Sequence, residues 1–146
     1  MLLRGALEKP SLLAAEKMVA YTEQRQRMLA ENIANIDNPH YRARQLDTEA
    51  FQAALGRAVR ARRQGGVGAP FTIEKTSEFH QDAAGRLVVT PSLTPPENVL
   101  FHDDTNARVE RQMAQLAENA MMHKVASELL RKEYDGLLKA IRGRIT

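Results

Sequence analysis

The first long segment without Gly or Pro covers residues 11–36 and reads SLLAAEKMVAYTEQRQRMLAENIANI. Pro10 and Ser11 are typical of a helix start, because Pro fits the first helical turn and Ser is a good N-cap. Residues 37–39, DNP, follow directly and disfavour any continuation of a helix. The sequence therefore predicts a helix over residues 11–36.

A second long segment opens near Thr105 and contains no Pro, and its first Gly is Gly136. A glycine inside a helix costs about 1 kcal/mol without necessarily ending it, whereas Gly143 is a natural stop. The sequence predicts a second helix over residues 105–142. Such a helix would be roughly 55 Å long, which is too long for a compact domain of 146 residues. We therefore expect an elongated molecule.

Apolar and small residues recur at alternating spacings of three and four in both segments, which is the pattern of a coiled coil. The pattern predicts that the two helices pair antiparallel, with Thr22 opposite Ser127. In the same register Gln26 meets His123, and this polar layer would fix the register. The alternative, that these polar residues face outward, stays open. The predicted interface residues are Leu12, Val19, Leu29, Ile33, Ile36, Met113, Leu116, Leu130, Tyr134 and Leu137.

Further apolar side chains lie off this interface, and a two-helix hairpin would not cover them. Exposed apolar patches of this kind usually mark contact surfaces, and the flexible side chain of Met suits surfaces that must fit several neighbours. The alternative is that these residues are buried under the middle of the chain. The candidate inter-subunit contacts are Met18, Tyr21, Met28, Met121, Met122 and Leu129.

The middle of the chain, residues 37–104, differs in composition from both flanking segments. It is richer in Gly and Pro and contains short β-branched runs at residues 71–73 and 87–90. A turn at residues 85–86, Gly-Arg, would join these runs into a hairpin near residues 71–90. The predicted fold is therefore mainly α, an antiparallel coiled-coil pair of terminal helices with a loop-rich middle segment that contains a small β element.

A cluster of four arginines lies in this middle segment and supplies most of the net charge of +3. The simplest interpretation is a solvated linker. The alternative function is a helical-hairpin adaptor that binds an acidic partner or nucleic acid through the cluster, with strongly salt-dependent binding. The cluster consists of Arg57, Arg60, Arg62 and Arg63.

No catalytic, cofactor-binding or metal-binding pattern is present in the sequence, and we expect no enzyme activity and no cofactor. The chain has no Cys, which excludes disulfides, thiolate catalysis and Cys-ligated zinc. His40, His80, His102 and His123 are scattered and lack the spacing of a metal site. No apolar run is long enough to insert into a membrane, and no cleavable signal peptide is evident.

Residues 29–44, LAENIANIDNPHYRAR, resemble the N-terminal signature of flagellar rod and hook proteins, in which L-A-x-N-I-A-N precedes T-P-G-Y and a basic residue. Here Asn38 and His40 replace the Thr and the Gly of that signature. Asn32 and Asn35 fall in the last turn of the predicted helix, where side-chain amides can satisfy free carbonyls and turn the chain outward. The matching motif residues are Asn32, Ala34, Asn35, Pro39 and Tyr41.

The C-terminal half carries a second resemblance, to the proximal rod proteins of that family. It lies in residues 109–119, VERQMAQLAEN, and in residues 140–144, AIRGR. The resemblance implies a self-assembling structural subunit of the periplasm-spanning rod, which contributes to motility. The implied partners are other flagellar rod proteins, basal-body base components, copies of the chain itself and the flagellar type III export apparatus, with no nucleic acid and no membrane insertion.

The resemblance also implies export without a cleavable signal peptide. Residues 1–10 would then be the flexible start of the chain that the export apparatus engages. Ordinary fraying of a chain end is the alternative interpretation of this segment.

Overall fold

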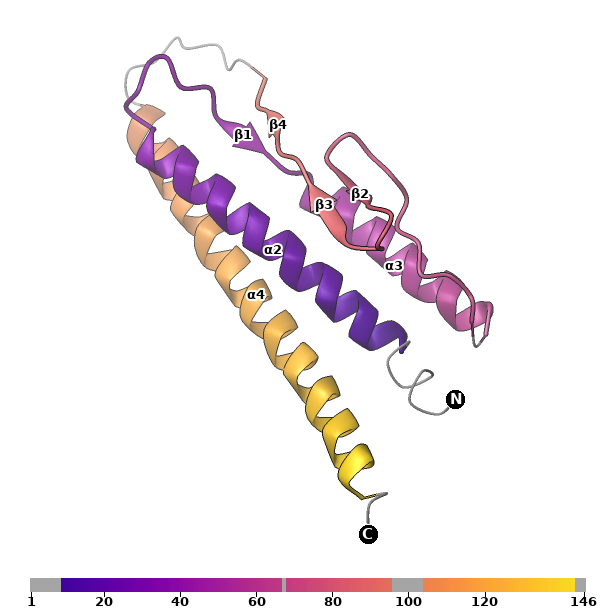
Figure 1. Ribbon diagram of the computed structural model, residues 1–146. Coiled ribbons are helices and arrows are strands. Elements are labelled where there is room, and N and C mark those ends of the chain that lie inside the picture. Colours follow the sequence, from indigo (N-terminus) through magenta and orange to yellow (C-terminus); the bar gives the residue numbers. More distant parts are fainter. Residues whose placement is uncertain (1–8, 67, 96–103, 144–146) are drawn as a thin grey trace.

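The computed structural model of the protein describes residues 9–66, 68–95 and 104–143. Over these residues the fold is mainly helical, as predicted, with two small two-stranded sheets. Figure 1 shows that the two terminal helices lie side by side, and that the remaining elements lie on the other side of the first helix. The elements are α2 (Pro10–Ala34), β1 (Arg44–Gln45), α3 (Thr48–Gln64), β2 (Phe79–Gln81), β3 (Leu87–Val89), β4 (Ser92–Leu93) and α4 (Asp104–Arg142).

The terminal helices lie close to the predicted ranges. Helix α2 begins with Pro10 at its first turn, and residues 1–8 of the predicted N-terminal segment lie outside the described residues. The helix ends two residues earlier than predicted, because Asn35 leaves the helical conformation and its side-chain Nδ2 donates to the Glu31 carbonyl at 2.9 Å. Ile36 therefore lies in the turn beyond the helix and is not an interface residue within it.

The prediction that residues 37–104 are irregular apart from a small β element is wrong for residues 48–64, which form the helix α3. Its first turn is capped by Asp47, whose side chain accepts from the Ala50 backbone N–H at 2.9 Å. Its buried face has the three-and-four spacing of an amphipathic helix. That face consists of Phe51, Ala54, Leu55, Ala58 and Arg62.

A β-hairpin lies within the predicted range of residues 71–90, but its first strand is β2 and not residues 71–73. Strand β2 pairs antiparallel with β3, with Phe79 opposite Val89. In the turn, the Asp82 carboxylate accepts from the Ala84 and Arg86 backbone N–H groups, and Gly85 supplies a φ of 75°. The hydrogen bond from the Arg86 backbone is the main cause that lowers the pKa of Asp82.

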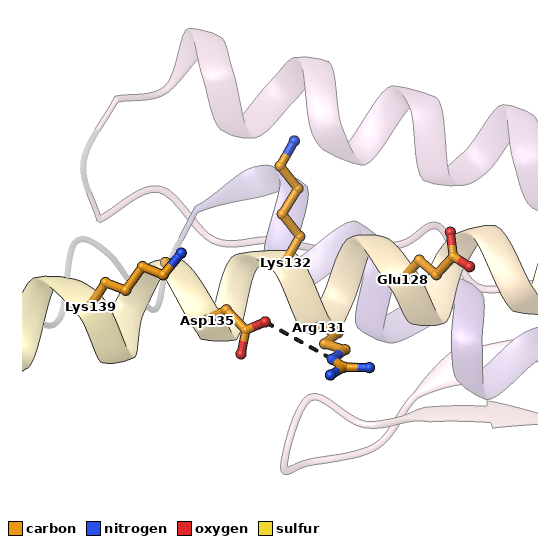
Figure 2. Close-up of a pocket in the computed structure, with 6 residues that line it drawn as sticks. Glu128, Arg131, Lys132, Asp135 and Lys139 are labelled. Carbon is orange, nitrogen blue, oxygen red and sulfur yellow. Dashed lines mark ion pairs between the residues drawn. The ribbon is translucent and has the colours of Figure 1, made fainter.

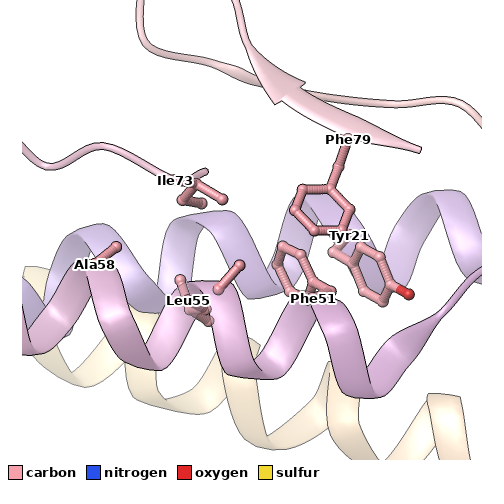
Figure 3. Close-up of a cluster of buried hydrophobic side chains, with 7 residues drawn as sticks. Tyr21, Phe51, Leu55, Ala58, Ile73 and Phe79 are labelled. Atoms are coloured by element: carbon pink, nitrogen blue, oxygen red, sulfur yellow. The ribbon is translucent and has the colours of Figure 1, made fainter. Parts of the chain in front are cut away.

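The main hydrophobic core joins α2 to α3 and the hairpin (Figure 3). The rings of Tyr21 and Phe51 are stacked with centroids 3.9 Å apart, and Phe79 meets Phe51 edge-on at 5.4 Å. Ile73 and Leu55 extend this cluster. The middle of the chain is thus anchored on the face of α2 that points away from α4.

One buried cation ties the hairpin turn to α2. Lys17 is buried, and its Nζ donates to the Gly85 carbonyl at 2.6 Å and lies 3.4 Å from the Glu16 carboxylate. The Gly85 carbonyl also accepts from Gln81 Nε2 at 3.3 Å. The sequence pattern gave no indication of this contact, because its two ends are far apart along the chain.

Lys17→Met is expected to lower the free energy of unfolding by about 1–2 kcal/mol, because a charge-assisted hydrogen bond is lost while the apolar stem stays buried. Chemical denaturation measures the loss, and amide exchange should become faster at residues 82–86. The matched control is Lys139→Met on the exposed face of α4, which should change stability by less than about 0.5 kcal/mol. Equal losses of stability in the two variants would contradict the assignment of a stabilising contact between Lys17 and the hairpin turn.

Candidate assembly surface

Helices α2 and α4 lie side by side (Figure 1), and polar side chains form part of their contact. Thr22 Oγ1 lies 2.8 Å from His123 Nδ1. Asn119 is fully buried, and its Nδ2 donates to the Thr22 carbonyl at 2.9 Å and to Gln26 Oε1 at 3.0 Å. Near the start of α2, Ser11 Oγ donates to Glu133 Oε1 at 2.8 Å. The polar residues Thr22, Gln26 and His123 therefore face inward.

The register of the two helices differs from the predicted one by a helical turn. The prediction placed Ser127 opposite Thr22 and His123 opposite Gln26, whereas the structure brings His123 to Thr22 and Asn119 to Gln26. This difference of four residues corresponds to about 6 Å along the helix axis. The predicted pairing is wrong for the register in this structure, because two heptad series match at more than one offset.

The predicted interface residues divide into three groups. Leu12, Leu29 and Leu137 are buried. A second group is half-buried and consists of Val19, Ile33, Leu116 and Leu130.

Met113 and Tyr134 are exposed, at 51% and 47%, so their assignment to the interface is wrong. The residues one position earlier, Gln112 and Glu133, are the less exposed ones, and Glu133 contacts α2 through Ser11.

Two of the candidate inter-subunit contacts are buried inside the subunit. Tyr21 stacks on Phe51 in the core, and Met28 is also buried, so both are unavailable to a neighbour and these two predictions are wrong. Met18 packs against the same core. For Tyr21 and Met18 the cause is α3, which packs on a face of α2 that the sequence pattern left without a partner.

Helix α4 does expose apolar side chains away from α2. Met121 is 72% exposed and Val125 66%, and Leu129 follows one turn further along. Met122 is half-buried. We call Met121, Val125 and Leu129 the α4 stripe, because they lie at successive spacings of four residues on one helix. No other described element covers this stripe.

The motif residues Asn32 and Tyr41 build the corner where the chain leaves α2. Asn32 Nδ2 donates to the Arg44 carbonyl at 2.7 Å, and its Oδ1 accepts from the Arg44 N–H and from the Tyr41 hydroxyl, both at 3.0 Å. Burial, reinforced by the nearby Glu31 carboxylate, raises the pKa of Tyr41, so this hydroxyl keeps its proton.

Asn32 was expected to bond a carbonyl of its own helix, and that prediction is wrong. It pairs with β1 instead, whereas Asn35 does bond the helix. Ala34 and Pro39 are exposed. No described residue other than glycine has a positive φ, so His40 fits its turn without requiring the glycine of the family signature.

The arginine cluster is part of α3 and not a linker. Arg57 forms an ion pair with Glu74 at 2.8 Å. Arg62 is buried and donates to the Ala69 carbonyl beyond the helix end. At least two of the four arginines are therefore engaged within the chain.

A shallow depression of about 390 Å³ lies on the outer face of α4 (Figure 2). All six lining residues come from this one helix, and Figure 2 shows Arg131 and Lys132 pointing away from each other. Arg131 Nε lies 3.9 Å from Asp135 Oδ2. In a catalytic cleft the functional side chains converge on a common point. The side chains that line this depression do not converge.

The described residues contain neither a metal-binding cluster nor a membrane-spanning helix. No group of three His, Asp or Glu side chains lies close enough together there to hold a metal ion. None of the described helices combines the length and the apolar character needed to cross a bilayer. His102 lies outside the described residues.

The described residues define a mainly helical protein with two long terminal helices side by side and an exposed apolar stripe on the second of them. Several known proteins are similar to this chain over most of its length. A Cereibacter sphaeroides protein is 32% identical over 130 residues, which cover 83% of this chain and 85% of that protein. An Aeromonas hydrophila protein is 29% identical over 120 residues, covering 82% and 83% of the two chains.

A Salmonella typhimurium protein is 28% identical over 121 residues, covering 82% of this chain and 84% of that protein. All three are named flagellar basal body rod protein FlgB. No protein-family model matches the sequence. The chain belongs to the FlgB family of flagellar basal body rod proteins, which confirms the resemblance seen in the sequence motifs.

Proposed function

We propose that this protein is a structural subunit of the bacterial flagellar basal-body rod. The observation that carries the proposal is its membership of the FlgB family over more than four-fifths of its length. The exposed α4 stripe supports it, because Met121, Val125 and Leu129 form an apolar surface that a neighbouring chain would cover.

The finer proposal is a subunit of the proximal rod, whose terminal helices form an antiparallel coiled coil and self-assemble. The polar layer of Thr22, His123 and Asn119 supports a specific pairing of these helices. The C-terminal AIRGR motif favours the proximal rod. Its partners would be other rod proteins, basal-body base components and copies of itself, in a rod that spans the periplasm.

Delivery to that location would use the flagellar type III export apparatus without a cleavable signal peptide. This part of the proposal follows from the family resemblance. The adaptor function through the arginine cluster has no support: Arg57 and Arg62 are occupied within the chain, and the relatives carry the name of a rod protein.

A deletion strain tests the proposal. Without the gene, cells should be non-motile and their purified basal bodies should lack a rod, and expression of the intact chain should restore both. Intact rods in the deletion strain would contradict the proposal.

Val125→Asp with Leu129→Asp is expected to leave the subunit folded and to reduce motility at least tenfold, because two buried carboxylates at a subunit contact would oppose assembly. Helicity measured by circular dichroism and swimming in soft agar are the two readouts. Lys124→Asp is the matched control, since it adds the same carboxylate to an exposed charged position on the same helix. Normal motility of the double variant would exclude the stripe as a contact.

A further inference from the structure

Helix α4 presents two alternative interface lines to α2, and the one in use is the more polar. Both lines share the half-buried or buried residues Leu116, His123, Leu130 and Leu137. The line in use completes them with Gln112, Asn119, Ala126 and Glu133. The alternative line lies one residue further along at each step and consists of Met113, Ala120, Ser127 and Tyr134.

The line in use leaves polar atoms buried without a partner. Asn119 Oδ1 and Gln112 Oε1 have no hydrogen-bond partner. Unsatisfied buried polar atoms oppose this arrangement. At the same time, the large side chains of Met113 and Tyr134 stay about half exposed. The hydrophobic free energy that their burial would contribute is therefore absent.

Specific hydrogen bonds favour the line in use. They join Thr22 to His123, Ser11 to Glu133, and Asn119 to α2. Two partly exposed ion pairs, Lys9 to Glu133 at 3.7 Å and Arg25 to Glu118 at 3.8 Å, add a smaller contribution. Each such hydrogen bond stabilises the pair by a free energy of the same order as the cost of one unsatisfied buried atom or of one exposed apolar side chain. The terms for and against this register are therefore close to balanced.

We propose that α4 has a second register on α2, displaced by one helical turn, in which Ser127 faces Thr22 and His123 faces Gln26. The change combines a slide of about 6 Å with a rotation of about 50°. It brings Tyr134 toward α2 and releases the unpartnered oxygens of Asn119 and Gln112 to water. One-turn shifts of packed helices are an established form of conformational switch.

The second register changes the shape of the subunit. In the observed register, Ser11 contacts Glu133, so the end of α4 from Tyr134 to Arg142 extends past the start of α2. The slide shortens this overhang by about one turn. Because α2 is shorter than α4, the slide lengthens the overhang at the other end of α4 by the same amount, so the two registers differ in how far each end of α4 extends past α2. This inference holds for the isolated subunit and does not depend on the rod function.

A distance measurement between spin labels at Ala30 and Lys139 tests the proposal. Both positions are exposed, and the chain has no cysteine of its own, so Ala30→Cys and Lys139→Cys give a clean labelled pair. Their separation along the axis is about 36 Å in the observed register and about 30 Å in the second. The unmodified subunit should show the longer distance as its main population.

Asn119→Asp should then move the main population to the shorter distance. A carboxylate at this position is buried in the observed register and faces water in the second. Ala120→Asp is the matched control, because it places the same charge on the alternative line and should keep the longer distance. A longer distance in both variants would overturn the proposal, and so would loss of helicity in Asn119→Asp without a shorter population.

Disulfide trapping gives a second readout that leaves the polar layer intact. Val19→Cys with Ala126→Cys tests the observed register, and Val19→Cys with Leu130→Cys tests the second. We expect both disulfides to form in the folded monomer, the second at no less than a tenth of the rate of the first. Formation of the first disulfide alone would show a single register and overturn the proposal.

Discussion

Phe51→Ala is expected to lower the free energy of unfolding by about 3–5 kcal/mol. Phe51 is fully buried, stacks on Tyr21 and meets Phe79 edge-on, so its loss leaves a cavity between α2, α3 and the hairpin. Helices α2 and α4 should stay paired, because their contacts lie on the opposite face of α2. Chemical denaturation measures the loss, and amide exchange should accelerate in α3 and the hairpin but not in α4.

Tyr21→Phe is the matched control in the same ring stack. It removes only the hydroxyl, which lies 3.3 Å from Thr48 Oγ1, and keeps the ring, so a loss of less than about 1 kcal/mol is expected. Burial raises the pKa of Tyr21, so the hydroxyl is neutral at ordinary pH and its removal takes away no charge. If Phe51→Ala instead accelerated amide exchange equally in all three helices, the middle segment would not be anchored on α2 independently of α4.

Asn32→Ala is expected to lower the free energy of unfolding by about 3 kcal/mol, because three hydrogen bonds are lost and the partner groups of Arg44 lose their bonds. These groups are the Arg44 N–H and carbonyl, and the Tyr41 hydroxyl loses its acceptor as well. The measurement is the denaturation midpoint. Amide exchange at residues 41–45 should identify the corner as the site of the loss.

Asn35→Ala is the control within the same motif. Its side chain makes one exposed hydrogen bond, to the Glu31 carbonyl, so we expect a loss below about 1 kcal/mol. Similar losses for the two substitutions would mean that the motif acts through helix termination alone, and not through the bridge from Asn32 to β1.

The sequence predicted the long terminal helices well because their signals are local. Pro10 marks one start, and the absence of Pro over residues 105–142 leaves a single uninterrupted pattern. The pattern also identified half of the α4 interface, at Leu116, Leu130 and Leu137. The other half was displaced by one residue, because Met113 and Tyr134 are more apolar than the residues that actually face α2.

Helix α3 was missed although its sequence carried a usable signal. Asp47 is a good N-cap, and Phe51, Leu55 and Ala58 have helical spacing. The Gly- and Pro-rich composition of residues 37–104 and the arginine cluster made the segment resemble a linker. Without α3, no partner was available for Tyr21, which is why this core residue was interpreted as part of an assembly surface.

The contacts of Asn32 and Asn119 could not be predicted from spacing. Asn32 was identified through the family motif, but its bond to β1 depends on the corner at residues 35–41. Asn119 occupies the interface only in one of the two registers that the heptad pattern permits. In each case the deciding contact joins residues that are separated in the chain.

A photoactivatable cross-linker at Leu129, examined in purified basal bodies, tests the central claim most directly. The exposed α4 stripe should then cross-link to rod subunits, either copies of this chain or other rod proteins, whereas a cross-linker at Leu55 in the core should give only intramolecular products. Absence of any intermolecular product at Leu129, with the protein present in the basal bodies, would contradict the claim that α4 packs against neighbouring subunits.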